Sequence, residues 1–583
     1  MLLKQFIFLL LCDLVLCLPD ATRRIRLVIS ANVSNPDCFN TEYPTLLVNG
    51  QFPAPPIHVL KGDLMEIYVD NQLETASTSL HFHGIRQYGS PEADGVPGVT
   101  QLPIGPGQHL LQRFRVTGQT GTYFYHAHSG MQDDFIQGPF IVHDSMDAMP
   151  PSVRGDNIRA DTDVLEDGPY TYNGERNLQL TEWWHQSFVE RQEYYEGPSF
   201  TFDHGSSSLL INGRTVHNTT YLDDTCHGYS TLNVQRNKVY RLRVIAGNTF
   251  RTVGLAIKDH PLTIIEVDGE MTQPYNTSYL EITPGQRFSV LINTGDAPPG
   301  THFAIATSYR WRRRGKGYTE NGLAYLRYVD DEDTSEYGTT THTIDPSQFS
   351  SHAKVASHPD LPPFPGEDNR DWIWPELMPL GPRDPILDEE PSRIIKLKAA
   401  TTKLADGRSR YTMNGRLPID REGSALASLI SLKHSVTRLS DLQADGYSPV
   451  MDTYPIFRNE TIDIVFQNGH SGNQCLIHPW HTHGHSHYLI ASGDGEYDHE
   501  KHKDIRNFPH PILKDVSTVY PTRDDPETGG CGWTKVRIVA DNPGMWAVHC
   551  HITSHMNQGK MVVLEESADE LIRRAALLGR SFS

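Results

Sequence analysis

The chain has 583 residues, which is too long for a single hydrophobic core and predicts three or four domains. Hydrophobic residues make up 38% of the chain, and 46 glycines and 39 prolines occur with many short runs of valine, isoleucine, tyrosine and phenylalanine. This composition favours β-rich domains with many turns. The formal net charge of -20 disfavours nucleic acids and anionic membrane surfaces as partners.

Residues 1–19 have the pattern of a secretory signal peptide. Lys4 supplies the positive charge, and the stretch from Phe6 to Leu18 is mostly apolar. No other segment is long and apolar enough to span a bilayer, so we expect a secreted protein, extracellular or in the cell wall, without a membrane anchor. Four sequons for N-glycans agree with secretion: Asn32, Asn218, Asn276 and Asn459.

The seven cysteines divide by position. Cys12 and Cys17 belong to the signal peptide, and Cys550 lies between two histidines in a motif described below. The four that remain are an even number in an oxidising compartment, so we expect two disulfides. The predicted pairs are Cys38 with Cys226 and, within the last domain, Cys475 with Cys531.

Three landmarks recur in the same order along the chain and indicate an internal repeat. Each copy opens with an Asn-Gly pair, continues with a strand that ends in Asn, and closes with a strand led by Gly. The opening segments are 47–51, 210–214 and 412–416, the middle strands 64–71, 239–248 and 462–468, and the closing strands 121–125, 300–304 and 544–548. Alternating apolar strands at this spacing, with Gly and Pro turns, predict an all-β chain of three related β-sandwiches.

These landmarks divide the chain into domains. We predict domain one at 20–147, domain two at 148–340 and domain three at 396–583. Residues 341–395 carry no clear copy of the repeat and are rich in Pro and Asp, so we expect a long linker that crosses domain two.

The residues that end the closing strands differ in their ability to bind metals. Copy one ends with His126-Ala127-His128, copy two with Ile305-Ala306-Thr307, and copy three with His549-Cys550-His551. On a β-strand the two histidines of copy three point to one side and the cysteine to the other. We therefore expect a thiolate site inside domain three and a histidine cluster shared by domains one and three. Domain two is expected to be a spacer or to shape a substrate surface.

Ten histidines and one cysteine fall into four short clusters. A single His-x-His pair is a weak signal, but four clusters at matching places in repeated units are a strong one. Because side chains alternate along a strand, His478 faces the opposite side from His481 and His483, which is the side of the thiol. The clusters are His81 and His83; His126 and His128; His478, His481 and His483; and His549, Cys550, His551 and His555.

Imidazole and thiolate ligands together suit copper. His478, Cys550 and His555 form a His2Cys set, the arrangement of a blue-copper electron-transfer site. The other eight histidines can hold three copper ions and leave positions open for oxygen. Zinc is the alternative metal, but a structural zinc site takes four closed ligands and does not need eight histidines.

The four clusters resemble the copper-binding motifs of the multicopper oxidases, over nearly the whole chain after the signal peptide. The chain resembles the secreted three-domain fungal laccases, in particular those of pigment synthesis, and the ascorbate-oxidase-like group. The resemblance implies three cupredoxin-like Greek-key β-sandwiches and four copper ions. It assigns His478, Cys550 and His555 to the type 1 copper, His81 and His481 to the type 2 copper, and His83, His126, His128, His483, His549 and His551 to the type 3 pair.

The resemblance also implies an activity. A small phenolic substrate, such as a diphenol or naphthol pigment precursor, gives single electrons to the type 1 copper. The electrons pass through Cys550 to His549 and His551, and four of them reduce O2 to two waters. We expect a laccase-type oxidase that is a monomer.

Three other functions remain open at the level of the sequence. Ascorbate oxidase and ferroxidase use the same copper sites, and a non-catalytic copper-binding protein is an alternative of another class. A ferroxidase needs carboxylates near its type 1 copper, whereas Trp480, Ser554 and Met556 are not acidic. The intact set of ligands disfavours a protein without activity.

Asp94 precedes Gly95 shortly after the first histidine cluster. In the family an acid in this motif lies near the type 2 copper and helps to deliver protons, which the reduction of O2 consumes. An aspartate that merely forms a turn before Gly95 is the alternative. The resemblance favours the catalytic role.

Three positions depart from the family pattern. Lys560 stands where relatives usually have Met, Leu or Phe beside the type 1 copper, and Met561 faces the wrong way unless a bulge shifts the register. Because a protonated lysine cannot bind a metal, we expect three strong ligands and no axial sulfur. Thr553 replaces an acid, so a second proton relay is expected to be missing or supplied elsewhere. Leu102 replaces a cysteine that many laccases bridge to the C-terminal tail, so that bridge is expected to be absent.

Overall fold

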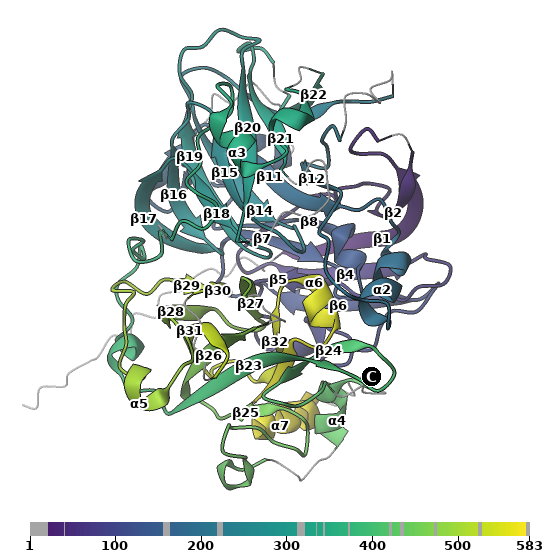
Figure 1. The fold of residues 1–583 in the computed structure, drawn as a ribbon, viewed down its shortest axis with the longest axis vertical. Helices are drawn as coiled ribbons and strands as arrows, with labels where there is room; N and C mark the ends of the chain where they lie inside the picture. Colours follow the sequence, from purple (N-terminus) through teal and green to yellow (C-terminus); the bar gives the residue numbers. More distant parts are fainter. Residues whose placement is uncertain are drawn as a thin grey trace, which may run out of the picture.

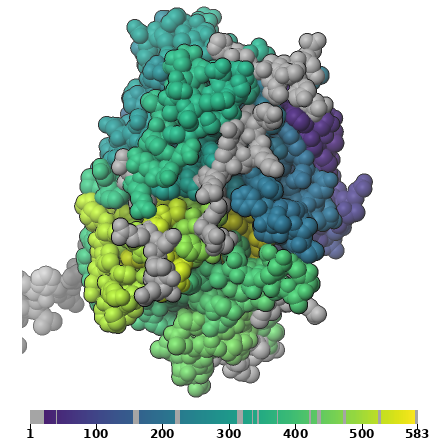
Figure 2. Space-filling model, viewed as in Figure 1, coloured from purple at the N-terminus to yellow at the C-terminus, as the bar shows by residue number. Residues whose placement is uncertain are grey.

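The computed structural model describes residues 21–39, 41–154, 164–217, 225–311, 321–333, 335–341, 344–370, 373–418, 423–431, 437–470, 475–522 and 528–578. Within these residues the chain forms mainly β-strands and a few short helices, arranged as three two-layered sandwiches (Figure 1). Domain two lies above domains one and three in this view, and all three meet near the centre (Figures 1 and 2). The prediction of an all-β chain with three sandwiches is confirmed.

Domain one consists of two four-stranded sheets. Their strands are β1 (Thr22–Ser34), β2 (Tyr43–Val48), β3 (Ile57–Leu60), β4 (Leu64–Asn71), β5 (His81–His83), β6 (His109–Arg115), β7 (Gly121–His126) and β8 (Gln137–His143). The strand orders are β2-β1-β4-β6 and β3-β8-β7-β5. Apolar residues such as Ile67, Val69 and Phe82 fill the space between the sheets.

Domain two consists of two six-stranded sheets and a two-stranded ribbon. Its strands are β9 (Leu165–Asp167), β10 (Tyr170–Tyr172), β11 (Gly174–Trp183), β12 (Ser208–Ile211), β13 (Tyr229–Val234), β14 (Val239–Ala246), β15 (Thr252–Ile257), β16 (Leu262–Val267), β17 (Glu270–Thr277), β18 (Leu280–Ile282), β19 (Arg287–Asn293), β20 (His302–Arg310), β21 (Leu323–Tyr328) and β22 (Tyr337–Thr340). The six-stranded sheets have the orders β12-β11-β14-β19-β16-β17 and β18-β15-β20-β21-β13-β22.

Domain three packs a six-stranded sheet against a five-stranded one. Its strands are β23 (Arg393–Lys403), β24 (Ser409–Met413), β25 (Tyr454–Ile456), β26 (Thr461–Gly469), β27 (His478–Thr482), β28 (His487–Gly493), β29 (Leu513–Lys514), β30 (Val516–Val519), β31 (Gly530–Val539), β32 (Gly544–Cys550) and β33 (Met561–Glu566). The strand orders are β24-β23-β26-β31-β28-β29 and β25-β33-β32-β27-β30.

The helices are short and lie at the edges of the sandwiches. They are α1 (Pro151–Arg154), α2 (Phe188–Glu196), α3 (His352–Ser357), α4 (Ala425–Ser431), α5 (His499–His502), α6 (Thr553–Asn557) and α7 (Ala568–Leu578), with 3-10 turns η1 (Pro91–Ala93), η2 (Gln132–Asp134), η4 (Pro346–Gln348), η5 (Pro385–Asp388) and η6 (Leu439–Asp441). α2 of domain two packs against α6 of domain three (Figure 1). Within the described residues, none of the helices combines the length and the apolar character that crossing a bilayer requires.

The Asn-Gly pair that opens each repeat forms the same tight turn. Asn49 and Gly50 have φ angles of 50° and 74°. Two successive positive φ angles define the two-residue type I′ turn, for which Asn-Gly is the favoured sequence. The Asn49 side chain accepts a hydrogen bond from the amide of Val28 on the neighbouring strand, at 2.8 Å. The same conformation recurs at Asn212 and Gly213 and at Asn414 and Gly415.

The three repeats also share an unusual strand pairing. The first long strand of each domain runs parallel to the strand that ends in or near Asn. These pairs are β1 with β4, β11 with β14, and β23 with β26. A parallel pair needs a crossover connection, so its recurrence in all three domains reflects a common topology and explains the repeat in the sequence.

The described part of the segment 341–395 lies against domain two and the core that domain two shares with domain three. Phe349, Val355 and Leu361 join a buried apolar cluster of domain two. Trp374 and Leu377 join the large shared core. The segment is therefore held along its course by buried apolar side chains.

Both predicted disulfides are present. Cys38 and Cys226 are joined across domains one and two, and Cys475 and Cys531 are joined within domain three. Three of the predicted glycosylation sites, Asn32, Asn276 and Asn459, have exposed side chains. Asn218 and the predicted signal peptide lie outside the described residues, and glycosylation at all four positions stays a prediction.

Candidate metal centre

Four short strands bring the histidine clusters together where domains one and three meet (Figure 1). In domain one, β5 pairs with β7 and sets His81 opposite His126. In domain three, β27 pairs with β32 and sets His481 opposite His549. All ten histidines of the clusters are buried. Segments that lie more than 350 residues apart in the chain therefore contribute to one buried region.

The first group, here called the thiol site, consists of His478, Cys550 and His555. The Sγ atom of Cys550 lies 3.7 Å from Nδ1 of His478 and 3.7 Å from Nδ1 of His555. A trigonal metal with zinc-like bond lengths of about 2.3 Å to sulfur and about 2.0 Å to nitrogen separates such atoms by about 3.7 Å. The three side chains that were expected to share a site lie together, at distances that fit one metal ion.

The second group, here called the histidine cluster, consists of the other eight imidazoles. Nε2 of His549 lies 3.1 Å from Nε2 of His483 and 3.4 Å from Nε2 of His128. The ring nitrogens form three groups within which all lie no more than 4.8 Å apart: His81, His83 and His481; His83, His126 and His551; and His128, His483 and His549. Nitrogens that converge in this way are arranged like the ligands of bound ions.

The backbone fixes which ring nitrogen faces the inside of the histidine cluster. Nδ1 of His81, His126, His481 and His549 lies 2.7, 2.8, 2.9 and 3.0 Å from a backbone carbonyl oxygen. Because a carbonyl only accepts, Nδ1 carries the proton and Nε2 keeps a lone pair. Nε2 of His81, His126 and His481 is buried without a hydrogen-bond partner. Metal-ligating histidines show this pattern, so the residues fit a bound metal.

The histidine cluster is also held in the neutral form that binds metals. Burial, together with the repulsion of a neighbouring imidazole, lowers the pKa of His549 to about 3. The same two causes lower the pKa of His483 to about 4, although Asp94 opposes them. Burial also lowers the pKa values of five other histidines of the cluster, which are His83, His126, His128, His481 and His551.

Three consecutive segments of the chain match family models described as multicopper oxidase. The matched residues are 29–147, 174–331 and 427–570, which together make up more than half of the chain. The chain belongs to the multicopper oxidase family. Membership implies copper as the metal of the clustered imidazoles and the thiol, and an oxidase that uses O2 and a reducing substrate.

The relatives of this multicopper oxidase include enzymes with different substrates. An L-ascorbate oxidase of Nicotiana tabacum is 30% identical over 89% of this chain and 86% of its own length. A laccase of Cryptococcus neoformans is 28% identical over 93% of this chain and 80% of its own length. An iron transport multicopper oxidase of Saccharomyces cerevisiae is 28% identical over 90% of this chain and 72% of its own length.

Solved structures share the fold of this multicopper oxidase. A laccase from Botrytis aclada superposes with a TM-score of 0.73 at 24% identity and covers 97% of this chain and 92% of its own. A multicopper oxidase that functions in iron import superposes with a TM-score of 0.70 at 24% identity and covers 96% of both chains. The cupredoxin-like three-domain architecture expected from the motifs is confirmed.

Asp94 lies in direct contact with two members of the histidine cluster. Its Oδ2 atom is 2.9 Å from Nδ1 of His483, and its Oδ1 atom is 3.3 Å from Nδ1 of His81. Burial by itself raises the pKa of Asp94, but His483 and His81 lower it by more, so this pKa lies below its ordinary value. Asp94 is therefore a carboxylate at neutral pH, and it orients two imidazoles of the oxidase.

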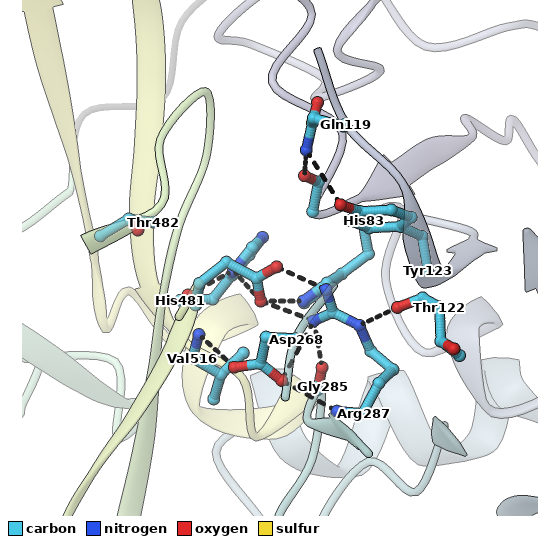
Figure 3. A network of polar contacts seen from close by, with 12 residues as sticks. His83, Gln119, Thr122, Tyr123, Asp268, Gly285, Arg287, His481, Thr482 and Val516 are labelled. Atoms are coloured by element: carbon cyan, nitrogen blue, oxygen red, sulfur yellow. Dashed lines mark hydrogen bonds and ion pairs between the residues drawn. The ribbon is translucent and has the colours of Figure 1, made fainter. Parts of the chain in front are cut away.

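Domain two supplies a buried ion pair to the histidine cluster. Nη1 and Nη2 of Arg287 each donate to Asp515 at 2.6 Å, and the Arg287 Nε donates to the backbone carbonyl of Thr122 in domain one (Figure 3). Asp515 in turn lies 3.1 Å from Nε2 of His83. Arg287 thus touches all three domains at once and fixes the residues behind His83.

Gly285 of domain two lies directly against the histidine cluster, where a larger side chain would not fit. Gly285 has a φ of +85°, and a Cβ atom at this position would lie 2.9 Å from Cδ2 of His551 and 3.0 Å from Cε1 of His83. Phe250 of the same domain packs against Cys550 in a small apolar cluster. Domain two therefore contributes no histidine or cysteine to the two sites but contacts both of them, so it is more than a spacer, and its part in shaping a substrate surface stays a prediction.

The position of Thr553, where an acid was expected by resemblance, is compensated by a neighbour. The Thr553 hydroxyl donates a hydrogen bond to Oδ2 of Asp133, a buried residue of η2 in domain one. Burial raises the pKa of Asp133 to about 7, against the opposing effect of Thr553. Domain one therefore places a buried acid with a raised pKa beside Thr553, and no motif in the sequence indicated it.

Lys560, and not Met561, lies on the thiol side of β33. Met561 pairs with His549 in the sheet and packs beside Val563, on the far side from the thiol. Lys560 is 2% exposed, and its amino group lies 5.1 Å from the ring centroid of Tyr411 and 5.7 Å from that of Trp480. The register of β32 with β33 shows no bulge over its paired residues, so a lysine lies on the side of the thiol site, at the position where the family resemblance predicts an apolar or thioether side chain.

A carboxylate approaches the thiol site from domain two, which the sequence did not indicate. The Ser554 hydroxyl, next to His555, donates to Oδ2 of Asp203 at 2.9 Å, and the Tyr195 hydroxyl donates to Oδ1 at 2.8 Å. Both residues of domain two come from α2 and the loop that follows it. The inference that the surroundings of His555 are not acidic was therefore incomplete.

A surface cavity reaches one residue of the histidine cluster. A cavity of about 660 Å³ is lined by His128, Ser129 and Gln132 of domain one and by Phe188 and Gln192 of α2. The cavity connects solvent with His128, a member of the histidine cluster. A small reactant such as O2 has to approach this cluster. Leu102 is exposed.

Proposed function

We propose that this multicopper oxidase is a secreted laccase-type enzyme that takes single electrons from small diphenols or naphthols and reduces O2 to water. In this proposal the type 1 copper is held by His478, Cys550 and His555, the type 2 copper by His81 and His481, and the type 3 pair by His83, His126, His128, His483, His549 and His551. When bound, the four coppers supply one-electron transfer at the thiol site and O2 reduction at the histidine cluster. The juxtaposition of the two sites through His549-Cys550-His551 carries the proposal.

Cys550 has two tasks in this proposal. Its thiolate lies in the thiol site, and its backbone is shared with His549 and His551 of the histidine cluster. Electrons therefore travel a few covalent bonds within one strand, without a diffusing carrier. The backbone carbonyl of Cys550 also accepts a hydrogen bond from Nδ1 of His549 at 3.0 Å. This hydrogen bond offers the electron a second, shorter path from the thiol to the imidazole of His549.

Protons reach the histidine cluster by way of buried carboxyls. Reduction of O2 to water consumes one proton for each electron. Asp133, with a pKa of about 7, is able to be protonated between turnovers and to release its proton through the Thr553 hydroxyl. Asp94 is ionised and holds the imidazoles of His81 and His483, and its part in proton delivery stays a prediction.

The surroundings of the thiol site support a phenolic substrate. The ring of Tyr411 lies 5.1 Å from that of His555, and α2 brings Tyr195 and Asp203 to the same edge. A phenol becomes strongly acidic when it loses an electron, so a nearby carboxylate such as Asp203 can accept its proton.

Oxygen consumption by the copper-loaded protein tests the proposal. We expect strong visible absorption from the thiolate and O2 uptake with a diphenol or a naphthol. Cys550→Ser should lose the absorption and the turnover and retain metal at the histidine cluster. A copper-loaded protein without this absorption, or one that consumes no O2 with phenols, contradicts the proposal.

Ascorbate oxidation is the second candidate, because ascorbate oxidases are 28–30% identical over about nine tenths of this chain. The same measurement with ascorbate and with Fe(II) separates the three activities. The laccase proposal requires that kcat/KM for at least one phenol exceed that for both other donors. Asp203→Asn should lower kcat/KM for the phenol by roughly 10-fold and leave the value for ferrocyanide nearly unchanged, because a phenol loses a proton with its electron whereas ferrocyanide gives up an electron alone.

A further inference from the structure

A second set of metal-binding side chains lies where domain one meets domain two, outside the thiol site and the histidine cluster. Asp37 belongs to the loop between β1 and β2, His185 follows β11, and His217 follows β12. One carboxylate oxygen and one ring nitrogen of each histidine all lie within 4.8 Å of one another. The three residues come from distant segments, so no spacing in the sequence indicated them.

The distances fit the coordination of a small divalent ion. Oδ2 of Asp37 is 2.8 Å from Nε2 of His185 and 3.6 Å from Nδ1 of His217. Two ligands of a tetrahedral zinc ion, with bonds of about 2.0–2.1 Å, are about 3.3 Å apart. Small rotations of the side chains therefore suffice to place all three around one ion. Ser208 adds a hydroxyl 2.7 Å from Oδ2 of Asp37.

The charge of Asp37 is incompletely compensated by the protein. The residue is 0% exposed, and its Oδ1 atom is buried without a hydrogen-bond partner. A buried carboxylate without a permanently charged partner is unfavourable, and a cation bound at Oδ2, the oxygen that faces both histidines, offsets its charge. Burial also lowers the pKa of His217 to about 4, so its ring is neutral at pH 7.

The surroundings hold these ligands in place before any ion binds. The amide of His217 donates to the backbone carbonyl of Asp37 at 2.7 Å, and the adjacent Cys38 is joined to Cys226 of domain two. The ring of Phe39 stacks on that of His185 with centroids 4.1 Å apart. Ligands that are already ordered lose little conformational freedom on binding.

We propose that Asp37, His185 and His217 form an additional metal site, for a divalent ion with the ligand preference of zinc, that fastens domain one to domain two. Two imidazoles and a carboxylate are a donor set that zinc favours, and a fourth position is left for the Ser208 hydroxyl or water. The ion joins two domains that the adjacent disulfide already links, so its role is to stabilise their contact. No step of the oxidase reaction runs through this site.

Zinc binding to the copper-loaded protein tests the proposal. The protein is equilibrated with Zn²⁺, desalted and analysed for both metals, and its melting temperature is measured with and without zinc. We expect one zinc per chain in addition to the copper, and a higher melting temperature with zinc. The variants are Asp37→Asn, which keeps the shape of the side chain, and the pair His185→Ala and His217→Ala. The matched control, His499→Ala with His510→Ala, removes two exposed histidines elsewhere.

In both site variants we expect zinc affinity to fall at least 100-fold and the zinc-dependent rise in melting temperature to disappear. The copper content and the visible thiolate absorption should remain, which shows that the variants are folded and that the copper sites are not the ones that took up zinc. Zinc uptake that is absent from the unmodified protein, or equal in the unmodified protein and in Asp37→Asn, overturns the proposal. Neither result bears on the laccase activity, which is measured separately.

Discussion

At the scale of single residues, Cys550 is surrounded by side chains that the motifs alone do not reveal. Phe250 packs against it from domain two, and Lys560 lies on its side of β33 between the rings of Tyr411 and Trp480. An apolar wall excludes water, and a buried positive charge favours the reduced form of a site that loses a positive charge on reduction. We therefore expect the Lys560 charge to raise the potential of the thiol site.

Lys560→Met is expected to lower the reduction potential of the thiol site. Two unit charges about 4 Å apart interact by about 4 kcal/mol at an effective dielectric constant of about 20, and by less at greater separation, so the loss of one nearby charge should lower the potential by tens of millivolts. Redox titration of the visible absorption measures the change. Lys560→Leu is the control, because it removes the charge without adding sulfur. An unchanged potential in both variants contradicts the role given to the charge.

A second prediction concerns the pH dependence of turnover. Asp133 has a pKa of about 7, so the fraction that carries a proton falls as the pH rises through 7. Turnover limited by this proton should fall over the same range, and Asp133→Asn should lower kcat about 10- to 100-fold and flatten the profile. Thr553→Val removes a hydrogen bond that lowers the pKa of Asp133, so its profile should shift to higher pH. A profile that does not move in either variant excludes Asp133 as the proton source.

At the scale of elements, the closing strand of each repeat carries the functional difference between the domains. β7 and β32 end in ligands, whereas β20 continues with Ile305-Ala306-Thr307 inside the core of domain two. The loop before β19 compensates by approaching the histidine cluster with Gly285 and Arg287. A domain that lost its ligands has kept the elements that support those of its neighbours.

Gly285→Ala is expected to damage the histidine cluster selectively. The added Cβ would press on the rings of His551 and His83, so copper at the cluster should fall below three ions per chain while the thiolate absorption remains. Gly300→Ala is the matched control, since Gly300 has a similar φ of +88° but open space around its Cβ position. Both variants carry a backbone cost of about 1–2 kcal/mol. Equal copper contents in both variants contradict the steric explanation.

At the scale of the whole molecule, both sites depend on contacts between domains. The histidine cluster takes residues from domains one and three, and Arg287 binds it to domain two (Figure 3). Domains one and two are further joined by a disulfide and by a hydrogen bond that Nη1 of Arg243 donates to the Thr122 hydroxyl at 2.8 Å. Conditions that weaken the contacts between domains should therefore lower the free energy of unfolding before they change the chemistry of any single residue in the two sites.

The buried pair His58 and His143 is expected to make the protein less stable in acid. Burial lowers their pKa values to about 4 and about 3, whereas both titrate near 6.5 in the unfolded chain. The unfolded chain therefore binds more protons below pH 6.5, and the free energy of unfolding falls as the pH drops from about 6.5 toward 4. His58 alone contributes a loss of about 2 kcal/mol at pH 5.

Urea unfolding at pH 7, 6 and 5 measures this dependence. His58→Gln removes one titrating group and should make the loss of stability between pH 7 and pH 5 smaller by about 2 kcal/mol. His499→Gln changes an exposed histidine and should leave the dependence as it is. If His58→Gln and the unmodified protein lose stability equally, the pair is not the cause.

The sequence by itself determined the local features of this protein. The Asn-Gly turns, the closing strands led by glycine and the alternation of His549, Cys550 and His551 depend on φ preferences and on the two-residue period of a strand. Those rules act between residues that are close in the chain. They were enough to predict the three sandwiches, the copper motifs and the separation of the thiol site from the histidine cluster. Counting cysteines after the predicted signal peptide gave the number of disulfides, and the location of Cys475 and Cys531 in the last domain suggested the pairing, which is confirmed.

Only the tertiary structure decided which residues stand behind the ligands. Arg287, Asp133 and Asp203 reach the copper sites from other domains, and Asp37 meets His185 across a domain contact. None of these pairs has a characteristic spacing, because packing between domains sets their distances and backbone periodicity does not. The position of Lys560 depended on a strand register without a bulge, which is fixed by the pairing of β32 with β33. Long-range packing therefore sets how the coppers are tuned, protonated and enclosed.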